Sequence, residues 1–212
     1  MRFLSAVIAT AALSGCAAPL LMMVPIAMTG AGYYKVYTMA SGGSVEISVD
    51  ESKVTAAQKA DLAKIKSLAV WPDESTGVAF AETLGKSNRF LVVTPLKVDQ
   101  SLRKLNIPVN TGTMTSVELN SALGRVTRDV NADAIVTAKL LTTKGEANYF
   151  SFDRANVTSS YLVSIYGRSR GATVVELPLS VKVIQGPDRP VEREIAVAAA
   201  QEVATKLVAI SN

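Results

Sequence analysis

Two runs near the start of the chain predict a β-hairpin. Residues 44–49 alternate strictly between polar and apolar side chains, a pattern typical of a strand with one buried face. The β-prone run 33–39 precedes it, and the turn-forming residues 40–43 separate the two runs. We therefore expect an N-terminal hairpin over residues 33–49.

Helices and buried strands alternate through the middle of the chain. Capping boxes begin two of the predicted helices, and apolar spacing marks two more. The boxes pair Thr55 with Gln58 and Thr115 with Glu118, and the expected helices are 55–66, 76–87, 98–105 and 115–130. The spacing places Val78 and Val117 on their buried stripes. Three nearly all-apolar runs predict strands buried on both faces: 67–71, 90–94 and 134–141.

The C-terminal third changes to a period of two and then ends in a helix. Residues 146–152, 161–166 and 173–184 alternate, with the basic turn GRSRG at 167–171, and predict an antiparallel meander. Pro178 within the last run predicts an edge position or a bulge. An Ala-rich amphipathic helix is expected over 188–210. Together these elements predict an α/β (α+β) fold with one mixed sheet and packed helices.

The first residues have the three parts of an export signal. Arg2 precedes a short apolar run, and Leu13-Ser14-Gly15-Cys16 follows it. This order resembles the bacterial lipoprotein signal, which implies cleavage between Gly15 and Cys16 and acylation of Cys16. Cys16 is the only cysteine, so no internal disulfide competes for its thiol. The alternative is an ordinary signal peptide cut near Ala17.

A second apolar stretch follows the cysteine. Residues 19–28 are too few to span a bilayer as a helix, and Pro25 would interrupt one. The stretch either lies among the lipid headgroups, folds onto its own domain, or packs against neighbouring copies beside the membrane. Ala17 in place of Asp favours the outer membrane in the best-known sorting rule. We therefore predict a signal peptide over 1–15, a lipid-anchored segment over 16–32 and a periplasmic domain over 33–212.

Composition excludes several kinds of chemistry. The 212-residue chain has no histidine, which excludes Ser-His-Asp and Cys-His nucleophile pairs and removes the commonest zinc ligand. No glycine-rich phosphate loop is present. The net charge is +4, but the basic residues are scattered, which argues against nucleic acid. We expect no catalytic residues, no cofactor, no metal and no small-molecule substrate.

Two adjacent carboxylates keep an enzymatic alternative open. Asp73 and Glu74 follow a predicted strand, where catalytic carboxylates are often found. We interpret them instead as the start of the following helix, where negative charge is favoured.

Three segments together resemble a known group of envelope proteins. They are IKSLAVWP (65–72), SNRFLVVTP (87–95) and VNADAIVTAKLL (130–141). They resemble the group that includes the TolB N-terminal domain, the curli-secretion lipoprotein CsgG and the penicillin-binding-protein activator LpoB. The resemblance covers residues 60–210 and departs from the pattern at Asn131 and Ala138, where glycines are usual. It implies a periplasmic domain that does not catalyse.

Members of that group activate partner enzymes or assemble into rings and export pores. We predict a non-catalytic assembly or accessory subunit on the periplasmic face of the outer membrane, ring-forming and serving secretion or envelope polysaccharide export. Its expected partners are membrane lipid through acylated Cys16 and either further copies or another envelope protein. The alternatives are an activator of a cell-wall synthase and a carboxylate-based envelope hydrolase.

Overall fold

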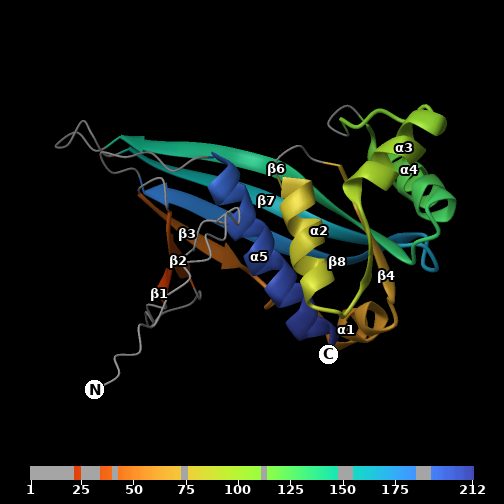
Figure 1. Ribbon diagram of the computed structural model, residues 1–212, viewed down its shortest axis with the longest axis horizontal. Helices are drawn as coiled ribbons and strands as arrows, with labels where there is room; N and C mark the ends of the chain where they lie inside the picture. Colours follow the sequence, from red (N-terminus) through yellow and green to blue (C-terminus); the bar gives the residue numbers. More distant parts are fainter. Residues whose placement is uncertain are drawn as a thin grey trace, which may run out of the picture.

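A single mixed β-sheet organises the protein. The computed structural model describes residues 22–24, 34–39, 43–72, 76–110, 114–147, 155–184 and 192–212. The sheet has eight strands in the order β1-β2-β3-β8-β7-β6-β4-β5 (Figure 1). The strands are β1 (Met22–Val24), β2 (Lys35–Thr38), β3 (Ser44–Val49), β4 (Ser67–Val70), β5 (Leu91–Val93), β6 (Ala134–Ala147), β7 (Ala155–Gly167) and β8 (Ala172–Ile184). The predicted α/β (α+β) class is confirmed.

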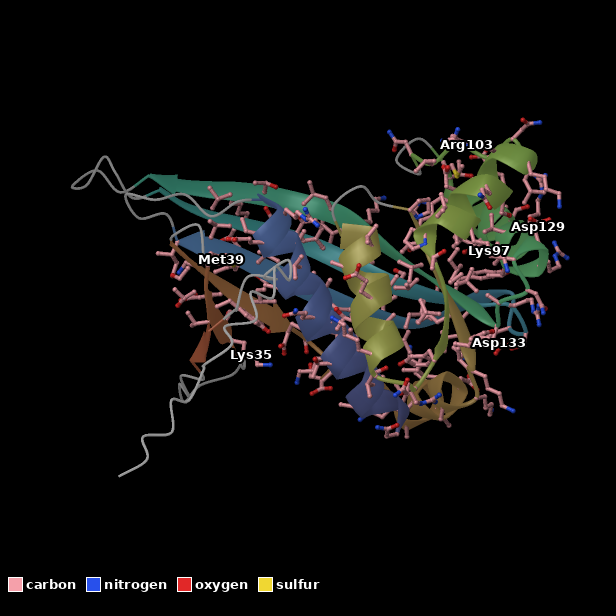
Figure 2. All side chains as sticks on the ribbon, in the orientation of Figure 1. Lys35, Met39, Lys97, Arg103, Asp129 and Asp133 are labelled. Carbon is pink, nitrogen blue, oxygen red and sulfur yellow. The ribbon has the colours of Figure 1, made fainter. Side chains whose placement is uncertain are left out.

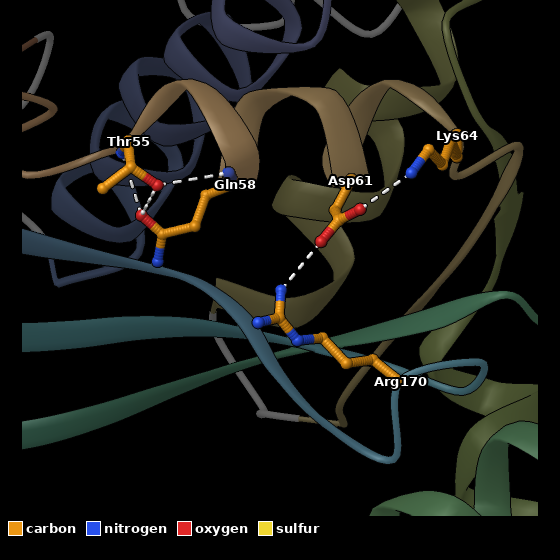
Figure 3. A network of polar contacts seen from close by, with 5 residues as sticks. All are labelled: Thr55, Gln58, Asp61, Lys64 and Arg170. Carbon is orange, nitrogen blue, oxygen red and sulfur yellow. Dashed lines mark hydrogen bonds and ion pairs between the residues drawn. The ribbon is translucent and has the colours of Figure 1, made fainter.

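Helices pack on both faces of this sheet. They are α1 (Ala56–Ala63), α2 (Thr76–Lys86), α3 (Pro95–Lys104), α4 (Ser116–Asp129) and α5 (Glu192–Ser211). One core lies between the sheet and α1, α2 and α5, with Leu207, Ile165 and Leu177 fully buried. A second core lies under α3 and α4, around Ile135 and Trp71. Both predicted capping boxes are present, and Figure 3 shows the one between Thr55 and Gln58.

The N-terminal hairpin forms as predicted and adds a further strand. β2 pairs antiparallel with β3, and β3 pairs with β8. β1 pairs with β2, with Met23 opposite Tyr37. Part of the apolar stretch 19–28 therefore joins the protein's own sheet, as one of the sequence alternatives proposed. Residues 1–21 and 25–33, which include Gly15 and Cys16, lie outside the described residues, and so do Asp73 and Glu74.

Two predicted strands are less buried than expected. β5 is the last strand of the sheet, and Leu91 in it is 75% exposed. β6 is buried over Ala134–Val136, where β4 pairs with it, and residues 138–145 beyond the end of β4 are exposed. β6 also continues to residue 147, well past the predicted end at 141. For β5 and most of β6, an apolar sequence therefore did not mean burial on both faces of the sheet.

Two predicted core positions are wrong, each for its own reason. Val78 is 53% exposed and Val117 is 79% exposed. Val117 lies in the first turn of α4, whose buried residues begin only at Ala122. Val78 lies in a buried part of α2 but on the outer side of that helix, because Gly77 and Phe80 on either side of it are buried. The periodicity therefore placed Val78 on the wrong side of α2, and it did not show where burial begins along α4.

Pro178 lies where a neighbouring strand stops. β3 ends at Val49, opposite Leu179, and the Asp50 amide donates to the Pro178 carbonyl at 2.9 Å. The missing N–H of proline thus points to the side where no further strand pairs among the described residues, so the predicted edge position is confirmed locally. The register shift of β8 against β7 lies elsewhere, beside Ile165.

Candidate functional site

The link between the predicted lipidation residue and the sheet is short. Five residues, 17–21, separate Cys16 from β1. Six residue steps span at most about 20 Å when fully extended. If Cys16 is acylated, the β1 side of the sheet therefore stays within that distance of the membrane surface.

A buried ionic contact fixes this side of the sheet to the C-terminal helix. Glu202 of α5 is only 6% exposed. Its carboxylate accepts hydrogen bonds from Lys35 Nζ at 2.9 Å and from the Tyr37 hydroxyl at 2.8 Å. Burial, reinforced by the hydrogen bond to Glu202, raises the pKa of the Tyr37 phenol far above its ordinary value. The contact joins β2 to α5 through one carboxylate oxygen, Oε2 of Glu202, which accepts from both donors.

The β6–β7 hairpin forms an arm whose outer edge has no strand beside it. β4 pairs with β6 only as far as Val136, while β7 accompanies β6 to residue 147. In the described residues, the edge of β6 over 138–147 therefore faces no other strand. We call residues 138–147 the arm edge. Figure 1 shows the hairpin extending past α2 and α5.

The arm edge carries apolar side chains that water does not favour. Leu140 and Leu141 are each 52% exposed, next to a register shift between Leu140 and Thr142. Lys139 and Lys144 flank them, and Lys144 is exposed. A long edge with exposed leucines is a template for pairing, and lysines are a common device that restricts which partner pairs there. The arm edge is therefore the foremost candidate for an interaction surface.

Further apolar residues lie on the same lateral side of the sheet. Leu91 of β5, Leu96 of α3 and Val78 of α2 are 75%, 68% and 53% exposed. The first turn of α2 lies beside the start of α3, since a Cβ on Gly77 would come within 3.5 Å of Pro95. The opposite lateral side ends in β1. The two sides of the sheet are thus unlike.

The face of the long strands opposite α5 is rich in hydroxyl groups. The strand registers place Ser48, Ser180, Ser160 and Thr142 in one row across β3, β8, β7 and β6. α3 and α4 pack on this side only near Ile135 and Tyr166. The same face also carries Leu162, Pro178 and the Lys182–Glu46 ion pair, and the hydroxyl row between them offers small polar groups to a hydrated ligand or an aqueous space.

A basic cleft lies at the turn between β7 and β8. Its volume is about 440 Å³, and Asp61, Lys64, Asp133, Arg168 and Arg170 line it. Asp61 contacts Lys64 at 2.9 Å and Arg170 at 2.7 Å, as Figure 3 shows. The hydrogen bond and charge of Lys64, helped by Arg170, lower the pKa of the Asp61 carboxyl. The cleft belongs to neither the arm edge nor the β1 side.

Asp133 is held mainly by backbone amides. Its Oδ2 accepts from the amides of Lys66 at 3.0 Å and Ser67 at 2.9 Å, while Arg168 Nη2 lies 3.8 Å from its Oδ1. Burial opposes ionisation, but these amide hydrogen bonds and Arg168 outweigh it and lower the pKa of Asp133. Asp133 therefore anchors the loop to β4 more than it neutralises Arg168.

The described residues offer no metal centre and no membrane-crossing helix. They contain no group of three or more His, Cys, Asp or Glu side chains placed to hold a metal ion. None of their helices combines the length and apolarity needed to cross a bilayer.

Local sequence patterns did not predict which side chains contact one another at these surfaces. Lys35 and Tyr37 share one face of an expected strand, and that spacing was the only signal for a common partner. Their partner Glu202 lies 167 residues from Lys35, and Arg170 lies 109 residues from Asp61. Contacts over such separations have no local pattern.

No family model and no curated protein matches this chain. Among solved structures it is similar to a single-residue variant of the PelC dodecamer from Paraburkholderia phytofirmans, with 15% identity and a TM-score of 0.38, over 75% of this chain and 97% of that chain. The PelC dodecamer without that substitution, from the same organism, gives 11% identity and a TM-score of 0.37, over 77% and 96%. The lipoprotein GNA1162 from Neisseria meningitidis gives 10% identity and a TM-score of 0.42, over 68% and 99%. Likenesses this loose transfer no function to this chain.

Proposed function

We propose that this protein is a non-catalytic, lipid-anchored subunit that assembles with further copies of itself on the periplasmic face of the outer membrane and serves export across the envelope. The arm edge carries the proposal. It is a ten-residue strand edge without a strand partner among the described residues, and it bears two half-exposed leucines. Such an edge is costly for a solitary subunit and useful for an assembling one.

The unlike sides of the sheet favour head-to-tail contacts. One side carries the arm edge and β5, and the other ends in β1. Contacts between unlike surfaces repeat from copy to copy and close into a ring when the rotation allows. A short link to Cys16 would hold every copy in one orientation on the membrane, which supports closure. The arm edge of one copy would then meet the β1 side of the next.

Cross-linking tests this assembly. A photoreactive amino acid at position 140, in the full acylated protein on membranes, is expected to give covalent multimers. The same group at position 117 serves as the control, because Val117 is exposed and apolar but lies on α4. Equal multimer yields from both positions, or none from position 140, would contradict the proposed interface.

The anchor has its own test. Cys16→Ser is expected to release the protein from the outer-membrane fraction into the soluble periplasm, because an unacylated chain lacks the two or more acyl chains that stable anchoring needs. Mass spectrometry of the wild-type N-terminus is expected to find acylated Cys16. A wild-type chain with a free Cys16 thiol would refute the anchor.

The hydroxyl-rich face suits a hydrated cargo. In a ring it would line an aqueous space, as expected for export of a secreted chain or an envelope polysaccharide. Ser180→Cys introduces a thiol on this face, and Leu140→Cys introduces one at the arm edge. In the assembled protein, with Cys16 acylated, a small maleimide is expected to label position 180 rapidly and position 140 slowly. The reverse order would place the hydroxyl-rich face between copies and refute this part of the proposal.

The alternative of a synthase activator has less support. An activator at the outer membrane needs a long reach from lipid to domain, and only five residues separate Cys16 from β1. Stable co-purification of a cell-wall synthase with the wild-type protein, lost on removal of the domain surface, would favour that alternative.

A further inference from the structure

The basic cleft has more positive than negative charge. Three cations, Lys64, Arg168 and Arg170, share it with two carboxylates, Asp61 and Asp133. Asp61 balances both Lys64 and Arg170, at 2.9 Å and 2.7 Å. Surface pairs elsewhere in the described residues match one cation with one carboxylate, as in Arg103–Asp99 and Lys104–Asp129.

The second carboxylate leaves its cation loosely held. Asp133 directs Oδ2 to two backbone amides, and Arg168 lies 3.8 Å from Oδ1, beyond hydrogen-bond distance. The Arg168 guanidinium also donates a hydrogen bond to the neutral Asn131 side chain at 3.2 Å. An arginine has five donors in a rigid fork. Most donors of Arg168 are therefore available to a ligand.

The cationic groups reach the cleft from two elements. Lys64 follows the end of α1, while Arg168 and Arg170 lie on the turn between β7 and β8, with Ser169 between them. Figure 3 shows the Arg170 guanidinium and the Lys64 ammonium converging on Asp61 from opposite sides. A tetrahedral group with several acceptor oxygens can bind two arginine forks and an ammonium at once, whereas a carboxylate offers only two oxygens.

We infer that this cleft binds a phosphate group. The group could come from free phosphate or from an anionic phospholipid headgroup, and the chemistry of recognition is the same for both. Lys35, beside β1, and Asp133, in the cleft, lie on opposite sides of the molecule (Figure 2). The inference does not depend on self-assembly, because no residue of the arm edge lines the cleft.

Titration calorimetry on the full acylated protein in a neutral detergent tests the inference with inorganic phosphate. Arg170→Gln and Arg168→Gln are each expected to weaken phosphate binding by at least about fourfold, the effect of one unit charge about 5 Å away in water. Asp61→Asn is expected to tighten it by a similar factor, because it frees two cations. Arg103→Gln is the matched control and is expected to change nothing, since Arg103 is an exposed arginine paired with Asp99 outside the cleft.

A second titration, with a soluble phospholipid, distinguishes a lipid headgroup from free phosphate as the ligand. Soluble dihexanoyl phosphatidylglycerol that binds with the same dependence on Arg168, Arg170 and Asp61 supports the inference and identifies a headgroup as a ligand. Binding of inorganic phosphate alone supports it and identifies the free anion. The inference is overturned if wild type binds neither probe, or if the cleft variants bind like Arg103→Gln. Thermal unfolding of each variant checks that the fold is retained.

Discussion

Glu202 illustrates how one side chain ties the N-terminal strands to the rest of the fold. Its carboxylate lies in α5 at 6% exposure, and its two donors, Lys35 and Tyr37, come from β2. A carboxylate buried this deeply is tolerated only when its oxygens are hydrogen-bonded. Because β2 pairs with β1, this contact also positions the strand that follows the predicted anchor.

Glu202→Ala is expected to lower the free energy of unfolding by about 2–4 kcal/mol. The substitution leaves the buried Tyr37 hydroxyl without its acceptor and Lys35 without its charge partner. Urea unfolding measures the change. Glu51→Gln is the control, because the Lys206–Glu51 pair at 2.9 Å is partly exposed, so its loss is expected to cost less than about 1 kcal/mol. An equal loss of unfolding free energy in the two variants would show that the burial of Glu202 adds nothing to its contribution.

The titratable groups predict how stability depends on pH. Lys64 first and Arg170 next hold the pKa of Asp61 below its usual range, and a hydrogen bond from Lys104 does the same for Asp129. A carboxyl with a lowered folded pKa stabilises the protein above its unfolded pKa, and this contribution is lost as pH falls through the folded value. The raised pKa of Tyr37 has the opposite sign, so its contribution is lost as pH rises past about 10.

Urea midpoints are therefore expected to be level between about pH 6 and 8 and to fall below about pH 4 and above about pH 10. The level region follows from the absence of histidine, the side chain that ordinarily titrates there. A step in stability between about pH 6 and 8 would contradict this expectation.

At the scale of elements, the arm is the part of the fold that most needs a partner. β6 and β7 stay paired for thirteen register positions, but β4 covers only three residues of the other side of β6. The result is a strong hairpin with a free outer edge. Its leucines stabilise little inside one subunit, because each is half exposed.

The double variant Leu140→Lys, Leu141→Lys is expected to dissociate the acylated protein into single subunits. Two added charges oppose burial of the arm edge between copies. The free energy of unfolding is expected to change by less than about 1 kcal/mol, because both positions are half exposed. Sedimentation velocity in detergent measures the assembly. Val117→Lys on α4 is expected to leave it intact, and dissociation by both changes would mean that charge alone disrupts it.

Local sequence signals predicted most elements because their causes are local. The capping boxes at Thr55 and Thr115 and the alternation over 44–49 all place elements correctly. What sequence could not predict was which neighbour each strand meets. The exposure of Leu91, the free length of β6 and the link from Glu202 to β2 depend on strand order, and strand order is set by contacts far apart in sequence. Within the candidate surfaces, the sequence predicted the apolar stretch that contains β1, the strand that contains Leu140 and Leu141, and the basic turn 167–171, but not the free edge of β6 or the cleft.

At the scale of the whole molecule, the functional surfaces occupy different parts of one sheet. The β1 side follows the predicted anchor, the arm edge lies on the opposite lateral side, and the basic cleft lies at the β7–β8 turn. In the proposed assembly, each subunit would use these separate surfaces for lipid, a neighbouring copy and an anionic ligand. We expect these surfaces to work together only when the subunit is on a membrane.

The mass of the full acylated protein, purified in mild detergent and measured by light scattering, tests the proposed assembly most directly. We expect one discrete species whose mass is a whole multiple of the subunit, because head-to-tail contacts that close give a fixed number of copies. A single-subunit mass, obtained with protein whose Cys16 is shown by mass spectrometry to be acylated, would contradict it.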